Sequence, residues 1–259
     1  MRTVKEKVYS RIKLLKQGDS FRDKVNILLF SILSPFFGIN ALFSDVQINT
    51  EKGRFNCRKK TDDISIFMGY DDSLDDFIDL QEGVFIDIGA HIGKFTVKVG
   101  RKLTGKVIAI ELMPNNYERL IKNIKLNKLN NITPLNIGCS NSSGKVKVYG
   151  PLKGKGKVFY SLKKNEKNKL IDQLEVKPLD NLVKELKLKK VDLIKIDVEG
   201  VEKEVLEGAI NTIQKFKPKI IFETNQSDFQ EFVKFFNKYK YKIKRIDENN
   251  AIAEYNGKK

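Results

Sequence analysis

Metal ligands and cysteines are scarce in this chain of 259 residues, which has two cysteines, one histidine and no tryptophan. Cys57 and Cys139 are far apart and lack the spacing of a metal-binding pair, and His91 alone cannot build a zinc site. We therefore expect no structural metal. The same cysteine usage predicts a reducing compartment, so we expect a cytoplasmic protein.

Arginine is also scarce, although the chain is strongly basic. The formal net charge is +16, from 49 Lys and Arg against 33 Asp and Glu, but only 8 of the basic residues are Arg. Surfaces that read nucleic acid favour Arg, because its guanidinium makes bidentate contacts with guanine and phosphate. The evenly spread lysines indicate a solvated surface, with an anionic partner as the alternative, and make nucleic acid a less favoured partner.

A convincing transmembrane segment is lacking. Residues 25–44 carry no formal charge and reach the length of about 20 residues that a spanning helix needs. Polar residues dilute this stretch, and Pro35 is expected to break it into two helices. We favour apolar helices that pack on the main domain. A segment lying on a membrane surface stays open, because eight Lys or Arg and only three acids precede residue 25.

The length suits one large α/β domain with a small extension, and 41% hydrophobic residues are enough for a core. We expect the extension at residues 1–80, with a small hairpin in residues 45–70 and then an acidic solvated helix face at residues 71–79. The main domain is expected at residues 81–259. Its lysine-rich stretch at residues 144–170 is broken by glycine and proline, which predicts a hairpin-like insertion.

Residues 84–94 combine an apolar strand, a glycine turn and the start of a helix, which is the pattern of a nucleotide-cofactor loop. Gly89 permits backbone torsions and close approaches that a side chain forbids, and Gly93 lies where a helix must pack tightly on the strand. The dinucleotide-binding pattern has a middle glycine that this chain lacks, since Ala90 and His91 follow Gly89. Their side chains leave fewer backbone amides accessible to a pyrophosphate. Asp87, at the end of the strand, suits a ligand with an ammonium group.

A second apolar strand ends in Glu111, 24 residues after Asp87, where a carboxylate accepts both hydroxyl protons of a ribose. A ribose together with an amino acid describes S-adenosylmethionine better than NAD. Asn136 and Cys139, at the end of the third strand, are candidates to lie near the adenine. A glycine turn that binds nothing is the structural alternative.

Strands and helices alternate regularly after residue 83. We predict strands at residues 84–89, 106–112 and 132–138, separated by helices at 93–103 and 115–129. This order is typical of a parallel sheet with helical crossovers.

The fourth core strand, at residues 191–200, contains charges where a parallel strand should be buried. Strand alternation places Lys195, Asp197 and Glu199 on one side, and the last two lie at the carboxyl end, where open α/β sheets bind ligands. Glu202 follows in the first turn of the next helix. The alternative is a purely structural ion pair between Lys195 and Asp197.

Residues 85–93 together with residues 193–209 resemble the FkbM family of methyltransferases, and the similarity covers roughly residues 45–225. The resemblance implies a class I methyltransferase fold: a mostly parallel, seven-stranded Rossmann-like sheet with helices on both faces. It also implies S-adenosylmethionine as donor and a hydroxyl acceptor on a sugar, glycan or similar metabolite. His91 stands where Asn is common in the family, a departure that is compatible with the glycine turn. We expect His91 to orient this loop and not to act as a base.

A hydroxyl nucleophile must lose its proton as it attacks, so the resemblance leads to a hypothesis about the catalytic residues. Asp197 or Glu199 takes the proton while Lys195 holds the carboxylate in place. Glu202 and Glu223 are second-rank candidates. The apolar N-terminal region and the lysine-rich insertion would both suit an acceptor linked to lipid or phosphate.

Three other functions stay open. The helix at residues 115–127 also resembles its counterpart in tRNA guanine methyltransferases, but the Asp197-Val-Glu-Gly run replaces their Asn-Pro-Pro-like motif, which argues against base methylation. A non-catalytic protein that binds a membrane surface and retains the fold is the second. NAD-dependent oxidoreduction, the third, is disfavoured by Ala90.

Overall fold

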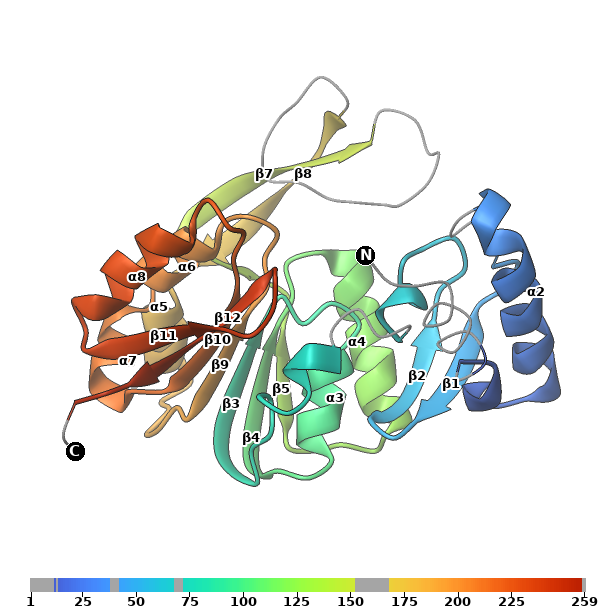
Figure 1. Ribbon diagram of the computed structural model, residues 1–259, viewed down its shortest axis with the longest axis horizontal. Coiled ribbons are helices and arrows are strands. Elements are labelled where there is room, and N and C mark those ends of the chain that lie inside the picture. Colours follow the sequence, from blue (N-terminus) through green and yellow to red (C-terminus); the bar gives the residue numbers. More distant parts are fainter. Residues whose placement is uncertain (1–11, 13, 38–41, 68–71, 152–167, 258–259) are drawn as a thin grey trace.

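A seven-stranded sheet forms the centre of the computed structural model, which describes residues 12, 14–37, 42–67, 72–151 and 168–257. The strand order is β11-β12-β10-β9-β3-β4-β5 (Figure 1). β12 runs in the direction opposite to the other six strands, so its pairs with β10 and β11 are antiparallel and the remaining pairs are parallel. The predicted mostly parallel α/β sheet is therefore confirmed. Its strands are β3 (Glu82–Ile88), β4 (Thr104–Ile110), β5 (Ile132–Leu135), β9 (Leu193–Ile196), β10 (Lys219–Glu223), β11 (Tyr241–Arg245) and β12 (Asn250–Tyr255).

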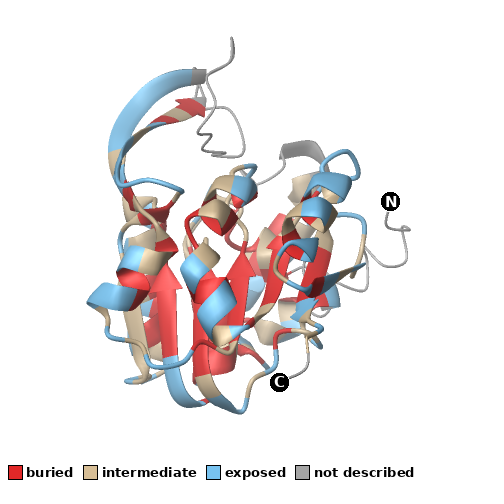
Figure 2. Ribbon diagram, turned by 90° about the vertical axis from the view of Figure 1, so that its left-hand side faces the viewer, coloured by how far each residue is buried: buried red, intermediate tan, exposed pale blue. Residues whose placement is uncertain are grey.

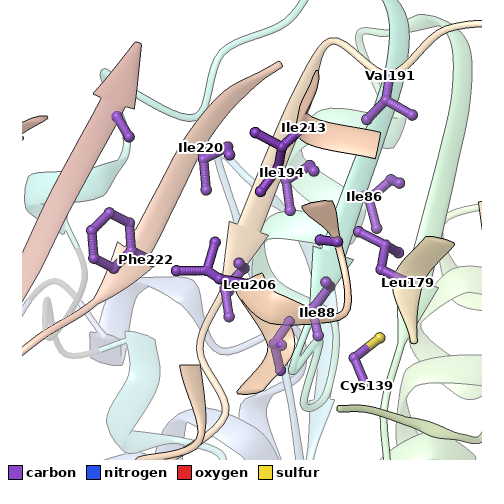
Figure 3. Close-up of a cluster of buried hydrophobic side chains, with 14 of the residues drawn as sticks. Ile86, Ile88, Cys139, Leu179, Val191, Ile194, Leu206, Ile213, Ile220 and Phe222 are labelled. Carbon is purple, nitrogen blue, oxygen red and sulfur yellow. The ribbon is translucent and has the colours of Figure 1, made fainter. Parts of the chain in front are cut away.

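Helices cover both faces of the sheet because its strands are apolar on both sides. On one face Ile86, Ile88 and Ile194 pack against Leu206 and Ile213 (Figure 3). That face carries α5 (Leu179–Glu185), α6 (Glu202–Glu207), α7 (Ile210–Phe216) and α8 (Phe229–Asn237). The opposite face packs against α3 (Lys94–Gly100) and α4 (Pro114–Leu126).

The fourth core strand is shorter than predicted. β9 ends at Ile196, so Asp197 and Glu199 lie in the following loop and strand alternation does not place them. The physical reason is backbone geometry: Glu199 and Gly200 have φ angles of 59° and 100°, which a β-strand cannot contain. The carboxyl-end location of both residues was nevertheless predicted correctly.

The N-terminal extension contains α2 (Phe21–Phe37) and a hairpin of β1 (Val46–Thr50) and β2 (Gly53–Cys57), which lies beside α4 (Figure 1). Side chains of α4 bond to the hairpin backbone: Asn123 Oδ1 accepts the Asn56 amide at 2.8 Å, and Asn127 Oδ1 accepts the Arg54 amide at 2.9 Å. The extension is thus fastened to the sheet domain by hydrogen bonds as well as by apolar packing.

Two predictions within the extension are wrong. Pro35 does not break the apolar stretch in two, because it lies in the last turn of a continuous α2, where the missing amide removes one hydrogen bond near the helix end. The helix starts earlier than expected, since Ser20 and Asp23 form a reciprocal capping box. The acidic run forms a short 3₁₀ turn, η3 (Asp72–Leu74), in place of the predicted helix face, and Asp75 pairs with Lys52 and Lys98. Asp76 and Asp79 are exposed, as predicted, and Asp71 lies outside the described residues. Among the described residues, no helix has the length and apolar character needed to cross a membrane.

An arm projects from the sheet domain and is largely exposed (Figure 2). It consists of the antiparallel strands β7 (Gly144–Pro151) and β8 (Asn168–Lys177), and β8 also pairs with β6 (Gly138–Cys139). Most of the predicted lysine-rich insertion, residues 152–167, lies outside the described residues.

Candidate functional site

A cavity of about 370 Å³ opens at the carboxyl ends of β3, β4, β9 and β10. Its wall includes nine of the residues proposed from sequence, which come from five separate segments of the chain. They are Gly89, Ala90, His91, Glu111, Cys139, Lys195, Asp197, Glu199 and Glu223. Asp87, Gly93, Asn136 and Glu202 are not part of the wall.

The turn after β3 needs glycine at two positions. Gly89 has φ +77°, and a Cβ there would lie 1.7 Å from the carbonyl oxygen of Asp197. Gly93 has φ +94°, and a Cβ would lie 2.7 Å from the Leu120 side chain. These glycines therefore bring the turn against the β9 loop on one side and against α4 on the other.

Glu111 is only 5% exposed and ties together the loops after β3 and β4. Its Oε2 accepts the His91 amide at 2.8 Å, and its Oε1 accepts the Met113 amide at 2.9 Å and the Asn116 side-chain amide at 3.4 Å. Burial raises the pKa of Glu111, and His91 together with these amides opposes the rise. The carboxylate is held in one orientation on the cavity wall.

Asp87, Lys195 and Asp197 form a chain of charges that starts beneath the cavity and ends at its wall. Lys195 Nζ lies 3.0 Å from Asp197 Oδ2 and 3.6 Å from Asp87 Oδ1, and only 4% of the Lys195 side chain is exposed. Asp87 Oδ2 also accepts the Thr96 hydroxyl at 2.6 Å. Asp87 therefore contacts Lys195 and Thr96, and the predicted Lys195–Asp197 pair has Asp87 as a third member.

Glu199 and Glu223 face the same end of the cavity as Asp197 and have perturbed pKa values. Burial and the nearby charge of Asp197 raise the pKa of Glu199, and the same two causes raise the pKa of Glu223 to about 8. Glu202 has a different role, because its Oε1 accepts the amides of Val198 at 3.2 Å and Gly200 at 3.1 Å. It shapes the loop that carries Glu199.

The remaining sequence candidates have mainly supporting positions. Asn136 donates to the carbonyls of Glu111 at 2.8 Å and Leu112 at 3.1 Å, and so joins the ends of β4 and β5. Cys139 is buried at the cavity wall, and burial raises the pKa of its thiol to about 12. His91 has φ 51°, and its Nε2 lies 3.8 Å from Asp62 Oδ1.

Asp62, Asp63 and His91 bring three potential ligand atoms within 4.8 Å of one another. The Asp63 carboxylate, however, is bound by the Arg58 guanidinium at 2.7 and 2.8 Å. A side chain that already neutralises Asp63 competes with a cation, so this group carries no metal assignment.

Sequence reasoning missed several residues of the wall. Lys94 is 3% exposed and donates to the Ile66 carbonyl at 3.0 Å. Asn249 and Asn250 reach the cavity from the turn between β11 and β12, and Val148 and Val176 reach it from the projecting arm. Lys94 follows the glycine turn directly and could have been found there, whereas the other four come from segments with no motif.

The wall is predominantly acidic, since five carboxylates outnumber the two lysines. The carboxylates are Asp62, Glu111, Asp197, Glu199 and Glu223. A low-dielectric cavity with this balance favours a ligand that carries positive charge.

The chain is similar in sequence to known methyltransferases. A family model described as the methyltransferase FkbM domain matches residues 87–243. The methyltransferase sdnD of Sordaria araneosa is 31% identical over 183 residues, covering 58% of this chain and 69% of that protein. The hexuronic acid methyltransferase AglP of Haloferax volcanii is 30% identical over 135 residues, covering 52% of this chain and 53% of that protein.

The fold comparison reaches almost the whole chain. A crystal structure of the methyltransferase FkbM from Methylobacillus flagellatus KT covers 96% of this chain with a TM-score of 0.51 and 15% sequence identity. This chain covers 58% of that structure and about half of AglP. At this identity the structural match supports the fold alone.

Proposed function

Because the chain belongs to the FkbM family of methyltransferases and is an S-adenosylmethionine-dependent enzyme, we propose that it methylates a hydroxyl oxygen of a sugar or glycan. The cofactor supplies an activated methyl group on a positively charged sulfur. The observation that carries the proposal is the Asp197 carboxylate, which lies at the cavity wall 3.0 Å from the buried Lys195 ammonium. This arrangement presents an oriented proton acceptor to a bound hydroxyl.

The residues of the cavity fit the cofactor. A volume of about 370 Å³ is suitable for a small-molecule site, and the excess of carboxylates suits a sulfonium and an ammonium group. In our proposal Glu111 accepts the ribose hydroxyls, and the backbone at Gly89 and Ala90 lies against the amino-acid part. Cys139 contributes to an apolar wall for the adenine, together with Val148 and Val176 of the arm. Asp87 acts through Lys195 rather than by direct contact.

In the proposed reaction the protein aligns the acceptor hydroxyl with the methyl group of the donor and removes one proton. This alignment can account for a large part of the rate of methyl transfer. An Asp197 oxygen takes the hydroxyl proton as the general base, and Glu199 is the alternative base. Lys195 fixes the orientation of Asp197, because the buried ammonium has that carboxylate on one side and Asp87 on the other.

A polyhydroxylated acceptor suits the Glu223 end of the cavity. Asn249 and Asn250 line the cavity together with Glu223, and Asn250 lies opposite Glu223 in the β10–β12 pair. The Asn250 Nδ2 donates to the Asp247 carboxylate at 2.9 and 3.0 Å, so we propose that its side-chain oxygen accepts from a sugar hydroxyl. The name of AglP, a hexuronic acid methyltransferase, supports uronic acids as the first acceptors to test. Lys94, one of two buried lysines in this wall, would favour an acidic sugar.

Calorimetric titration with S-adenosylmethionine tests the donor half of the proposal. We expect Glu111→Gln to weaken binding about tenfold or more, because a buried carboxylate loses its charge-assisted hydrogen bonds. Glu118→Gln, at an exposed position on the neighbouring α4, is the matched control and should bind as the wild type does. Equal affinity in the two variants would contradict the assignment of Glu111.

The acceptor half is tested by incubating the same protein with labelled donor and a panel of uronic acids, neutral sugars and transfer RNA. Methylation of a sugar hydroxyl is expected. Methylation of RNA with strongly salt-dependent binding would instead favour the RNA-methyltransferase alternative.

A further inference from the structure

Helix α2 is apolar on two opposite sides, although among the described residues only one side packs against the rest of the protein. Ile27 and Phe30 are 0% and 3% exposed and pack with the β1–β2 hairpin. The other side forms an exposed stripe with helical spacing, which we call the outer face of α2. It consists of Phe21, Val25, Leu28, Leu29 and Ile32, with exposed fractions of 84%, 39%, 46%, 39% and 57%.

The exposed apolar surface is concentrated in this one region. Of the nine large hydrophobic side chains that are exposed among the described residues, seven lie within residues 12–43 and two lie on β8. Ile12 and Phe43, 51% and 55% exposed, extend the set beyond the helix. Figure 1 shows α2 at one end of the molecule, on the far side of β1 from the sheet domain. Contiguous apolar surface of this kind marks an interaction site.

Positive charge borders the outer face. With about 100° of rotation per residue in an α-helix, Arg22 and Lys24 lie on opposite flanks of the stripe, and both are exposed. The nearby acidic side chains have other partners: Asp23 is 4% exposed and bonds to Ser20 in the capping box, and Asp19 pairs with Arg54. Eight Lys or Arg and three acids occur in the first 24 residues. The stripe is therefore apolar in the middle and cationic at its edges.

We infer that the outer face of α2 docks on the surface of an anionic lipid bilayer, with the helix lying in the interfacial plane. An interfacial helix needs an apolar face at the depth of the acyl chains and cationic groups at the level of the lipid phosphates. The 17 residues of α2 provide both without crossing the bilayer.

A second copy of the chain is a poorer occupant of this face. In a two-fold contact with parallel helices, Arg22 and Lys24 would face the same cations of the second copy, and with antiparallel helices they would face its last turn, which carries no acid. Anionic lipid provides the opposite charge in either orientation. The inference goes beyond the proposed function, because docking requires neither the cofactor nor an acceptor.

Vesicle co-sedimentation of the full-length protein tests the inference. The probes are phosphatidylcholine vesicles and vesicles that also contain phosphatidylglycerol. We expect binding to the anionic vesicles that decreases with salt, and a loss of about tenfold or more in affinity for the double variant Phe21→Ser and Ile32→Ser. The matched control is Leu170→Ser with Ile171→Ser, which removes the two exposed apolar side chains of β8 and should leave binding unchanged.

A second variant, Arg22→Gln with Lys24→Gln, should weaken binding to anionic vesicles without reducing S-adenosylmethionine affinity, which confirms that the protein is folded. The inference is overturned if the wild type binds neither vesicle, if it binds both equally, or if the β8 control loses binding as the α2 variant does. It is also overturned if light scattering shows a wild-type dimer that becomes a monomer in the α2 variant, because a second copy would then occupy the face.

Discussion

The two ends of the cavity differ in the hydrogen bonding of their carboxylates. At the β4 end, Glu111 accepts three hydrogen bonds and is almost completely buried. At the β9–β10 end, the side chains of Glu199 and Glu223 have no hydrogen bond to any other described residue, and among these residues only Lys195 bonds to the Asp197 carboxylate. The carboxylate at the β4 end is thus already oriented by hydrogen bonds, whereas Glu199 and Glu223 keep their oxygens available for a ligand.

This difference suits the two ends of the cavity to two different functions. A carboxylate that is already oriented costs little to use in binding, so the β4 end suits a cofactor that binds in the same way in every turnover. At the β9–β10 end, burial and then the charge of Asp197 raise the pKa values of Glu199 and Glu223, and a raised carboxyl pKa favours proton transfer near neutral pH. We therefore propose that the donor binds at the β4 end of the cavity and that the proton is removed at the β9–β10 end.

The largest expected effect would come from removing the proton acceptors. We expect Asp197→Asn, or Asp197→Asn with Glu199→Gln, to reduce turnover about 10²–10⁴-fold, the usual contribution of a general base. Affinity for S-adenosylmethionine, measured by calorimetry, should be retained because Glu111 is intact. Glu248→Gln, at an exposed position, is the control. Unchanged turnover in both Asp197→Asn and Glu199→Gln would contradict the proposal that a carboxylate of the β9–β10 end removes the proton.

The next effect concerns Lys195, whose charge is shared between Asp87 and Asp197. Replacing it by Met should lower the free energy of unfolding by about 3–5 kcal/mol, because Asp87 is left as an uncompensated buried charge. Urea denaturation measures the loss, and Asp87→Asn in the same background should restore part of it. Lys190→Met, which breaks the more exposed pair with Asp192, is the control and should cost about 1 kcal/mol or less. Equal losses in the two lysine variants would show that Asp87 needs no buried partner.

The sequence was informative where several local signals agree with one another. The turn from Asp87 to Gly93 could be predicted because strand, glycine and helix signals follow one another within a few residues. The end of β9 was missed because charged and apolar residues continue to alternate through Glu199, although the backbone there is left-handed and Glu202 stabilises it by accepting two amides of the loop. In helix α2, Pro35 predicts a break, although a proline in the last turn of a helix disturbs only its end.

The acceptor end of the cavity was only half predictable for a related reason. Asp197 and Glu199 stand in a recognisable run, but Asn249 and Asn250 come from a turn about fifty residues later that no motif marks. Their position depends on pairing of β12 with β10, where Asn250 lies opposite Glu223. Such long-range pairing is a property of the sheet and leaves no local pattern.

The smallest predicted effect is a change in the pH dependence of stability caused by Glu223. Its pKa is raised from the usual 4.5 to about 8, mainly by burial and then by Asp197. The folded protein therefore holds this proton more tightly than the unfolded chain does. The resulting stabilisation is fully present below pH 4.5 and is lost as the pH rises through 8.

Glu223→Gln cannot lose a proton, so urea denaturation at pH 5 and pH 9 should show a smaller fall in stability than the wild type, by about 2 kcal/mol after allowance for solvent screening. Adding Asp197→Asn to the wild type should shrink the same fall, because the neighbouring negative charge is the second cause of the raised pKa. If wild type and Glu223→Gln instead lose stability in parallel, Glu223 is ionised throughout this range. In that case the charge of Asp197 would not influence the ionisation of Glu223. The two ends of the cavity would then differ only in the number of hydrogen bonds that their carboxylates accept.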